Sequence, residues 1–152
     1  MALDEPDIVI RGMTVRDADV VVGAAALFDV PPTAQWTSAF LANDNHHLLM
    51  ATTSAGRPVG FISGMEIFHP DKGSEMLLYE LGVAEDARRR GIGRALVGAL
   101  RELARHRGCV AMWVLTEPDH EPPVRTYVSA GGAAEAVGQM LVWNLDDVAR
   151  QP

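Results

Sequence analysis

The stretch EMLLYELGVAEDARRRGIGRALVGALRELARHRG, residues 75–108, decides the fold predicted for this chain. Its first part, Glu75 to Val83, is an apolar run of strand length. Its last part, Gly91 to Gly108, repeats apolar residues at helical spacing and carries charged residues on the opposite side. The order strand, glycine-containing turn, helix is typical of a phosphate site, because free N–H groups at a helix N-terminus point toward the ligand.

The turn between the predicted strand and helix has the chemistry that a pyrophosphate needs. Gly91 and Gly93 lack a Cβ, so a ligand can approach the backbone closely. The arginines at 88–90 add positive charge and can form paired hydrogen bonds to phosphate oxygens. A solvated basic loop at a helix start remains open on these residues alone. The P-loop and Rossmann patterns do not fit, since no Gly-Lys pair is present and Leu96 stands where the Rossmann pattern has its third glycine.

Outward from this stretch, the chain divides into strands and helices with recognisable boundaries. Towards the N-terminus we expect a strand at Ile8–Met13, a helix from a capping box at Thr14 and Asp17 to about Phe28, a helix at Thr33–Leu41, and a hairpin of His47–Thr53 and Pro58–Phe68. Towards the C-terminus we expect a strand at Val110–Thr116, a short helix from Pro122 or Pro123 to about Ala130, and a last strand at Ala136–Leu145. Short connections make the three consecutive middle strands antiparallel. The order β-α-α-β-β-β-α-β-α-β predicts a single α/β domain over residues 1–152, with its core at about 8–145.

Composition is that of a globular protein with an acidic surface. The chain has 152 residues, of which 48% are hydrophobic and 22% charged, as expected for one domain. The net charge of −7 argues against nucleic acid or an anionic membrane as partner and favours a cationic one. Met1–Pro6 lacks the basic start of a signal peptide and no apolar run approaches a membrane span, so we expect a cytoplasmic protein.

The turn also matches a family signature. Arg88 to Gly93 fits the pattern arginine or glutamine, x, x, glycine, x, glycine or alanine, and the chain resembles the GNAT N-acetyltransferase superfamily over nearly its whole length. The resemblance implies an α/β domain with a mixed, largely antiparallel sheet, splayed at the acetyl-CoA site and flanked by helices on both faces. It implies acetyl-CoA as co-substrate, with the pyrophosphate on the turn and the acetyl and pantetheine groups on the preceding strand. The residues so implied are Arg88, Arg89, Arg90, Gly91, Ile92, Gly93 and Arg94 for the pyrophosphate, and Leu81, Gly82 and Val83 for the acetyl and pantetheine groups.

A closer likeness concerns the acceptor. Residues 74–83 (SEMLLYELGV) and 122–127 (PPVRTY) resemble small aminoglycoside 3-N-acetyltransferases of this superfamily. This implies a cationic small molecule as partner, an aminoglycoside acetylated at its 3-amino group. Two alternatives stay open: an acetyltransferase for a polyamine, an amino-acid derivative or a protein amine, and a non-catalytic acyl-CoA-binding module. Relatives often dimerise, which leaves a homodimer open as well.

Acetyl transfer needs a neutral nucleophilic nitrogen and a proton for the departing thiolate. Glu80 is the candidate base, because it interrupts an apolar run where desolvation favours its taking up a proton. Tyr127 is the candidate acid, because the resemblance implies a tyrosine near the CoA sulfur. The competing interpretations are a Glu80 that faces water at a strand edge and a Tyr127 that packs in the core with a satisfied hydroxyl.

Three carboxylates, Glu117, Asp119 and Glu121, crowd the loop after the strand at 110–116. An acidic rim attracts a polyamine-like cation, and the similar aminoglycoside enzymes carry carboxylates in this loop, so we expect substrate binding here. The alternative is a solvated loop with a helix cap at Asp119 or Glu121.

The remaining metal-binding or nucleophilic side chains predict no further site. His46 and His47 are adjacent, so in a strand they point to opposite faces and make a poor metal pair, which favours a structural role. The single cysteine, Cys109, permits no intrachain disulfide. It follows Gly108 at the start of a strand and is expected to be a small buried hydrophobe. We therefore expect no metal.

Overall fold

The structure is a computed structural model that describes residues 7–135 and 138–145. Within these residues one sheet has the strand order β1-β2-β3-β4-β5. Neighbouring strands are antiparallel from β1 to β4, and β5 is parallel to β4. The strands are β1 (Val9–Gly12), β2 (His46–Thr52), β3 (Pro58–His69), β4 (Gly73–Val83) and β5 (Ala111–Trp113). The predicted α/β fold with a mixed, largely antiparallel sheet is confirmed.

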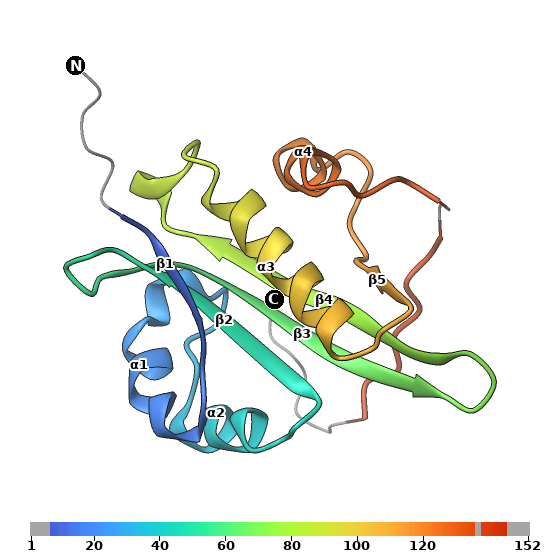
Figure 1. Ribbon diagram of the computed structural model, residues 1–152, viewed down its shortest axis with the longest axis horizontal. Helices are drawn as coiled ribbons and strands as arrows, with labels where there is room; N and C mark the ends of the chain where they lie inside the picture. Colours follow the sequence, from blue (N-terminus) through green and yellow to red (C-terminus); the bar gives the residue numbers. More distant parts are fainter. Residues whose placement is uncertain (1–6, 136–137, 146–152) are drawn as a thin grey trace.

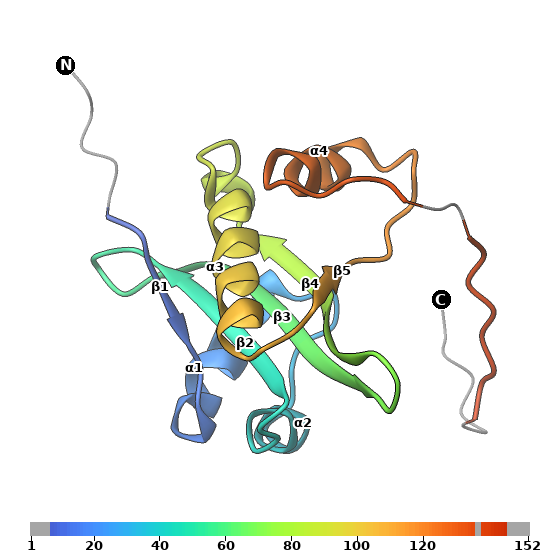
Figure 2. The same cartoon turned by 45° about the vertical axis from the view of Figure 1, so that its right-hand side comes forward.

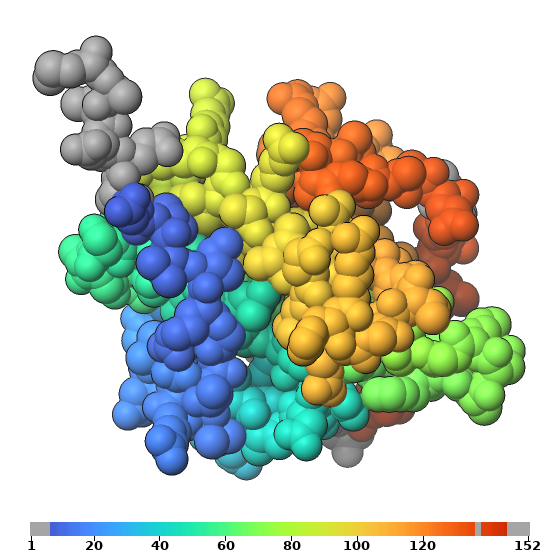
Figure 3. All heavy atoms as spheres, viewed as in Figure 1, coloured from blue at the N-terminus to red at the C-terminus, as the bar shows by residue number. Residues whose placement is uncertain are grey.

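Helices cover both faces of this sheet (Figures 1 and 2). They are α1 (Ala18–Gly23), α2 (Ala34–Leu41), α3 (Ile92–His106) and α4 (Glu121–Ser129). The long helix α3 packs on one face, and α1 with α2 packs on the other. In the space-filling view α3 lies between the N-terminal elements and α4 (Figure 3). None of the helices in the described part has the length and apolarity that crossing a membrane requires.

The sheet therefore separates two cores. Along β2, Leu49 and Ala51 pack beneath α3, whereas Leu48 and Met50 pack against the α1 and α2 side. Successive side chains of a strand point to opposite faces, so a strand covered on both sides is apolar throughout. This explains the unbroken apolar run of β2.

Small residues in β3 allow α3 to lie close to the sheet. A Cβ on Gly64 would stand 2.9 Å from Leu100 Cδ1 and from Met76 Sδ, and one on Gly60 would stand 3.1 Å from Leu96 Cδ1. Leu96, Leu100 and Met76 are themselves fully buried. The glycines thus determine where α3 packs on the sheet, and therefore where its N-terminus lies.

The first predicted helix is interrupted. Thr14 and Asp17 form the expected capping box, but it opens a short 3₁₀ turn, η1 (Val15–Asp17), and α1 ends at Gly23 before a second 3₁₀ turn, η2 (Ala25–Leu27). A run of valines followed by glycine has low helix propensity, so nothing local holds one continuous helix here. The break matters for the site, because it places the carbonyl of Leu27 against β4.

The C-terminal prediction is wrong in part. Residues 138–145 form no strand, while residues 136 and 137 of the predicted strand Ala136–Leu145 lie outside the described residues. The apolar side chains of residues 140–143 and of Leu145 are exposed. The strand β5 is also shorter than predicted, Ala111–Trp113 instead of Val110–Thr116. A strand forms only where a neighbouring edge offers hydrogen bonds, and alternation in the sequence does not provide that edge.

Candidate functional site

Strands β4 and β5 separate along their length. They pair only from Glu75 with Ala111 to Leu77 with Trp113. β4 then continues to Val83, paired on its other side with Gly60 of β3. In the described part of the chain, no strand pairs with residues 78–83 on the β5 side. The predicted splay is confirmed, and it leaves backbone N–H and C=O groups available to a ligand.

A β-bulge explains where the separation begins. Ser63 pairs with Glu80 and Gly64 with Leu78, so Tyr79 has no residue opposite to it in β3. A bulge bends its strand and increases the local twist. Tyr79 follows within two residues of the last position paired with β5, so the bulge turns the rest of β4 away.

The bulge also exchanges the two faces of β4. Before it, Met76 and Leu78 pack under α3, and after it Leu81 and Val83 do so. Gly82 consequently faces the α1 side, where a Cβ would stand 2.5 Å from the carbonyl oxygen of Leu27. Glu80 alternates with Leu81 and shares the face of Gly82.

The arginine- and glycine-containing turn ends in an open helix N-terminus. Gly91 is the N-cap residue of α3 and has a φ of 76°, in the left-handed region that glycine adopts without strain. The N–H of Ala95 donates to the carbonyl of Gly91 at 2.9 Å, the first hydrogen bond of the helix. Within residues 7–135 and 138–145 the N–H groups of residues 92–94 donate to no protein acceptor. Three free donors and the positive end of the helix dipole therefore meet at this turn.

The charged side chains of the turn fall into two groups. Arg88 is tied to the fold, since its Nε donates to the carbonyl of Val83 at 3.3 Å. Arg89, Arg90 and Arg94 are exposed and have no side-chain partner among the described residues. These three guanidinium groups lie beside the helix N-terminus, and guanidinium groups can form hydrogen bonds to an anion.

An ion pair anchors the start of the turn. Arg57, in the loop between β2 and β3, donates through one nitrogen to both carboxylate oxygens of Asp86, at 2.6 and 2.8 Å. These hydrogen bonds hold the pKa of Asp86 below its usual value. The turn is thereby connected to the hairpin at the far side of β3.

Helix α4 approaches the same place from the other side. A Cβ on Gly93 would stand 3.2 Å from Thr126 Cγ2 of α4, and 3.8 Å from Leu81 Cδ2 and from Val83 Cγ2 of β4. Tyr127 follows Thr126 and packs against the core under α3. Burial raises the pKa of its phenol, so the hydroxyl keeps its proton. The start of α3, the end of β4 and α4 thus converge around Gly93.

A hollow of about 300 Å³ lies between α3 and α4. Its lining consists of Arg94, Gly98, Arg101, Ser129, Ala130 and Gly131. Arg101 donates to the carbonyl of Ala130 at 3.2 Å and so fixes one wall. Sequence-based prediction did not include Arg101 or Ser129. The available signal was the spacing of Arg94 and Arg101, which are seven residues apart and lie on one side of α3.

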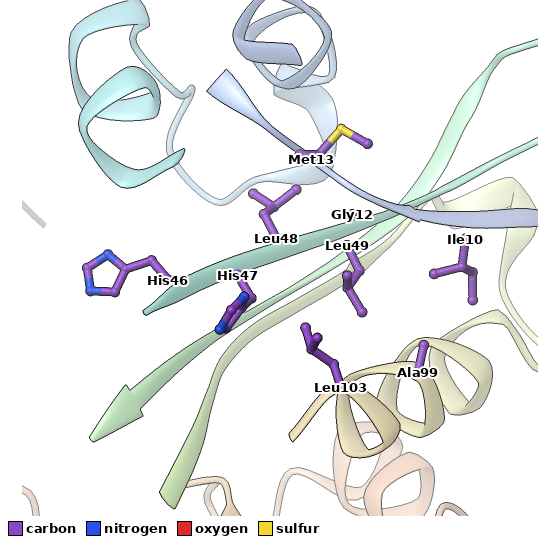
Figure 4. Close-up of a pocket in the computed structure, with 9 residues that line it drawn as sticks. All are labelled: Ile10, Gly12, Met13, His46, His47, Leu48, Leu49, Ala99 and Leu103. Carbon is purple, nitrogen blue, oxygen red and sulfur yellow. The ribbon is translucent and has the colours of Figure 1, made fainter. Parts of the chain in front are cut away.

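Another hollow, of about 370 Å³, has none of the residues of this turn in its lining (Figure 4). It lies between β1, β2 and α3, and Ile10, Leu49, Ala99 and Leu103 give it a largely aliphatic wall. None of the predicted site residues lines it.

Glu80 lies half-buried on the opposite face of β4 from α3. Its backbone N–H donates to Ser63 Oγ at 3.1 Å. Burial, and then the negative charge of Asp29, raise the pKa of the Glu80 carboxyl above its usual value. Asp29 was not predicted as a site residue. It follows Phe28, whose ring stacks on Phe61 with centroids 4.0 Å apart, and this stacking brings Asp29 to β4.

The three acidic residues after β5 are not equivalent. Glu117 and Asp119 are exposed and enclose a tight turn, in which the N–H of His120 donates to the carbonyl of Glu117 at 3.0 Å. Glu121 begins α4 and accepts from Arg125 at 2.7 Å, a pair within the helix. The N-cap residue is His120, so neither Asp119 nor Glu121 has the capping position considered for them.

The two histidines and the cysteine lie apart from this region. His47 Nε2 and Glu66 Oε2 are 2.8 Å apart, and Arg107 donates to the same oxygen at 3.0 Å. The ring of His46 packs against Phe40 with centroids 5.0 Å apart. Cys109 is half-buried and accepts a weak contact from Ser74 Oγ at 3.8 Å. The predicted structural roles agree with these contacts.

Comparison with known proteins gives one family and a set of similar folds. A family model described as acetyltransferase (GNAT) family matches residues 14–131, more than half of the chain. An aminoglycoside acetyltransferase from an uncultured soil metagenomic sample is 23% identical with a TM-score of 0.79, over 91% of this chain and 99% of that one. A second enzyme of that description and source, in complex with sisomicin, is 16% identical with a TM-score of 0.80, over 91% and 97% of the two chains. Aminoglycoside N-acetyltransferase AAC(6')-Iy in complex with CoA is 18% identical with a TM-score of 0.75, over 95% and 98%. No curated protein sequence matches the chain.

Proposed function

The chain belongs to the acetyltransferase (GNAT) family, and from this premise we propose that it acetylates a primary amine of a cationic small molecule, most specifically an aminoglycoside. As a member of this family it is an acetyl-CoA-dependent N-acetyltransferase. The observation that carries the proposal is the open edge of β4 beside the free N–H groups of α3. The extended thioester arm of acetyl-CoA fits the open edge of β4, and its pyrophosphate fits the free N–H groups of α3.

The residues present fit acetyl-CoA. The free N–H groups of Ile92, Gly93 and Arg94 suit the pyrophosphate, and the exposed side chains of Arg89 and Arg90 suit its charge. The open edge at Leu81, Gly82 and Val83 suits the amide groups of the pantetheine arm by strand-like pairing. In the proposed arrangement Arg88 holds the turn through Val83, and the hollow at Arg101 and Ser129 takes a further polar part of the nucleotide.

Acetyl-CoA, when bound, supplies an activated acetyl group on a thiol leaving group. Glu80 accepts the proton that the acceptor's ammonium must lose before its nitrogen can attack. Its raised pKa suits this step, because a carboxylate with a higher pKa is a stronger base. Tyr127 keeps its proton at neutral pH and can donate it to the departing sulfur. Starting from the ammonium, the nitrogen gains the acetyl group and loses two protons, one to Glu80 before the attack and one as the tetrahedral adduct collapses. The thiolate gains one proton, from Tyr127, so the overall reaction releases one proton to solvent.

The acceptor is proposed from charge and from the similar folds. The chain is acidic, with a net charge of −7, and Asp29 and Glu80 lie close together on the face of β4 opposite α3. Glu117 and Asp119 add two exposed carboxylates in the loop after β5. Glu121 adds a third carboxylate, which also accepts a hydrogen bond from Arg125. Multiply charged amines are attracted to such a surface. The proposed position is the 3-amino group, because residues 74–83 and 122–127 resemble small aminoglycoside 3-N-acetyltransferases.

The test is an assay of free CoA release with a panel of aminoglycosides, polyamines, amino-acid derivatives and N-terminal peptides. Turnover with aminoglycosides, and a product whose acetyl group is located at the 3-amino nitrogen by NMR, is the expected result. Turnover only with another amine would refute the aminoglycoside acceptor and leave the acetyl transfer intact. Binding of acetyl-CoA without turnover of any amine would instead favour an acyl-CoA-binding module.

A further inference from the structure

The turn between β4 and α3 contains a residue in an unfavourable conformation. Arg89 has a φ of 63°, and it is the one residue other than glycine with a positive φ in the part of the chain that the structure describes. A Cβ disfavours this left-handed region, and a residue stays there only when its surroundings fix the backbone. The conformation of the turn therefore depends on the contacts that hold it.

The backbone of the turn supplies few of these contacts. Ala87 and Ile92 are buried and fix its two ends, but residues 88–91 between them are exposed. Within residues 7–135 and 138–145, the N–H groups of residues 89–91 donate to no protein acceptor. The N–H of Arg88 donates to the carbonyl of Glu85 at a long 3.4 Å. Side-chain contacts are left to hold the turn.

One such contact comes from the hairpin loop between β2 and β3. Gly60 of β3 pairs with Val83 of β4, so this loop and the turn lie at the same end of the sheet (Figure 1). Arg57 in the loop bonds to both carboxylate oxygens of Asp86, at 2.6 and 2.8 Å. Asp86 lies in η3 (Glu85–Ala87), the 3₁₀ turn directly before residues 88–91. The pair therefore ties the start of the turn to the far side of β3.

The charge of Asp86 and its contact with Arg57 act on phosphate binding in opposite directions. The hydrogen bond from Arg57 lowers the pKa of Asp86 most, and the positive charge of Arg90 also lowers it. The carboxylate is thus ionised at neutral pH and lies within electrostatic reach of a guanidinium beside the helix N-terminus. Its negative charge by itself repels a phosphate, whereas its ion pair holds the turn. A variant without the carboxylate shows which of the two effects is larger.

We propose that Arg57 and Asp86 are positioning residues, which hold residues 88–91 in the conformation that binds the pyrophosphate of acetyl-CoA. This inference rests on the pyrophosphate site of the proposed function and adds two residues that do not themselves touch the ligand. Without the pair, the exposed turn with its unfavourable residue samples other conformations. The affinity for the ligand then falls by the fraction of time that the binding conformation is lost.

The first experiment is calorimetry with acetyl-CoA alone. Asp86→Ala should raise the Kd about three- to fivefold, the range expected when a surface ion pair is lost. Glu85→Ala is the matched control, because Glu85 is an exposed carboxylate of the same 3₁₀ turn and has no side-chain partner among the described residues. Both variants remove one negative charge beside the phosphates, so charge alone predicts equal or tighter binding in both. We expect weaker binding in Asp86→Ala only.

The second experiment breaks the pair from the side of the hairpin. Arg57→Gln should raise the Kd by a similar factor, whereas Arg57→Lys keeps a cation that can pair with Asp86 and should retain most of the affinity. Arg11→Gln is the control for the loss of a positive charge. The side chain of Arg11 is 56% exposed, compared with 54% for Arg57, and it pairs with Asp17 at 3.0 Å outside the turn. Its substitution should leave the Kd unchanged.

Kinetics and unfolding separate positioning from a general structural role. With an amine found active in the panel, Asp86→Ala should raise the KM for acetyl-CoA and leave kcat and the KM for the amine unchanged. The midpoint of denaturant unfolding should change little, because the side chains of Arg57 and Asp86 are 54% and 64% exposed. A joint fall in kcat and stability would show that the pair supports the whole fold, and it would overturn the inference.

Two further results would overturn it. Asp86→Ala would bind acetyl-CoA as tightly as the unmodified chain or more tightly, or Glu85→Ala would lose as much affinity as Asp86→Ala. Neither result bears on the proposed function, which requires that the unmodified chain bind acetyl-CoA and release CoA in the presence of an amine. An unmodified chain that did not bind acetyl-CoA would instead refute the proposed function, and the inference with it.

Discussion

The two halves of β4 behave differently although they belong to one continuous strand. The first half, Gly73–Leu78, pairs with β3 and is joined to β5 through residues 75–77, and Met76 and Leu78 are 0% and 2% exposed. The second half, Glu80–Val83, pairs with β3 alone and is half-buried throughout. The bulge at Tyr79 separates them. The closed half has a neighbouring strand on both sides, whereas the open half leaves one backbone edge unpaired and carries the carboxylate that we propose as the base.

Each half has a characteristic polar partner. Beside the closed half, Glu66 pairs with Met76 across the ladder, and its side chain is 2% exposed while it accepts from His47 and Arg107. On the open half, Glu80 has no side-chain hydrogen bond among the described residues, and its carboxyl faces the like charge of Asp29. Substitutions of the two carboxylates should therefore separate stability from activity.

The largest effect is expected from Glu80→Gln in the open half. The amide cannot accept the ammonium proton, so kcat/KM for the amine substrate should fall by about 100-fold or more. The free energy of unfolding should not decrease, because the side chain bonds to no described residue and its raised pKa means that its charge does not stabilise the fold. The affinity for acetyl-CoA should stay the same. Steady-state kinetics, denaturant unfolding and calorimetry check the three quantities. An unchanged kcat/KM would remove Glu80 from the role of base.

Beside the closed half, Glu66→Gln in β3 should lower the free energy of unfolding by about 2 kcal/mol, because a buried charged acceptor of several hydrogen bonds is lost. Glu102→Gln is the matched control, since its carboxylate is 63% exposed and pairs with Arg105 on the surface, and it should cause no measurable change. Equal stability of both variants would contradict the role given to Glu66.

The same residue predicts a pH dependence of stability. Although burial alone would raise it, hydrogen bonds from Arg107 and His47 hold the pKa of Glu66 below its usual value. A carboxyl with a lowered folded pKa stabilises the fold above its unfolded pKa and loses that contribution as pH falls through the folded pKa. Acid should thus destabilise the unmodified chain more steeply than Glu66→Gln.

At the junction of the open half with η2, Gly82→Ala should lower the free energy of unfolding by about 1 to 3 kcal/mol. The new Cβ would stand 2.5 Å from the carbonyl oxygen of Leu27 and 2.6 Å from Phe61 Cε1, so backbone must move. Gly98→Ala provides the opposite result, because its Cβ meets nothing within 4 Å and alanine stabilises a helix by about 0.5 to 1 kcal/mol. Thermal unfolding of the two variants measures the loss of stability in Gly82→Ala and the gain in Gly98→Ala.

Much of this comparison was predictable from the sequence. Local patterns predict three consecutive elements. An apolar run predicts the strand, two glycines predict the turn at Arg88–Arg94, and a 3.6-residue period predicts the helix after it. The open helix N-terminus follows from these patterns, and the structure agrees with it. Glu80 was also visible, as a charge inside an apolar run.

The remainder depends on contacts that no local pattern contains. The bulge at Tyr79 exists because β3 and β4 fall out of register, and register is a property of the pair of strands. Asp29 approaches Glu80 because the helix before it breaks and Phe28 stacks on Phe61. Residues 138–145 alternate like a strand but pair with no strand of the described sheet, and such pairing depends on a neighbouring edge that the local pattern does not contain.

At the turn beyond the open half, Gly91→Val should lower the free energy of unfolding by about 1 to 2 kcal/mol, because a side chain at a φ of 76° is strained. The substitution disturbs the start of α3, so the Kd for acetyl-CoA should rise about tenfold. A Cβ here meets nothing within 4 Å, so the cause is conformation and not a clash. Gly91→Asn is the control, since asparagine tolerates this region, and it should bind nearly as well. Calorimetry that gave equal affinity for Gly91→Val in a folded variant would argue against the turn as the pyrophosphate site.

The smallest expected effect is a shift in the pH profile caused by Asp29→Asn. Burial first, and then the charge of Asp29, raise the pKa of Glu80, so removing that charge should lower this pKa toward its usual value without restoring it fully. The base acts as a carboxylate, and kcat/KM rises as pH increases through its pKa; the acid limb should therefore move to lower pH in Asp29→Asn. Asp19→Asn is the control, because Asp19 is an exposed residue of α1 and should leave the limb in place. A limb that moved equally in both variants would mean that overall charge, and not the approach of Asp29 to the open half of β4, sets the pKa of the base.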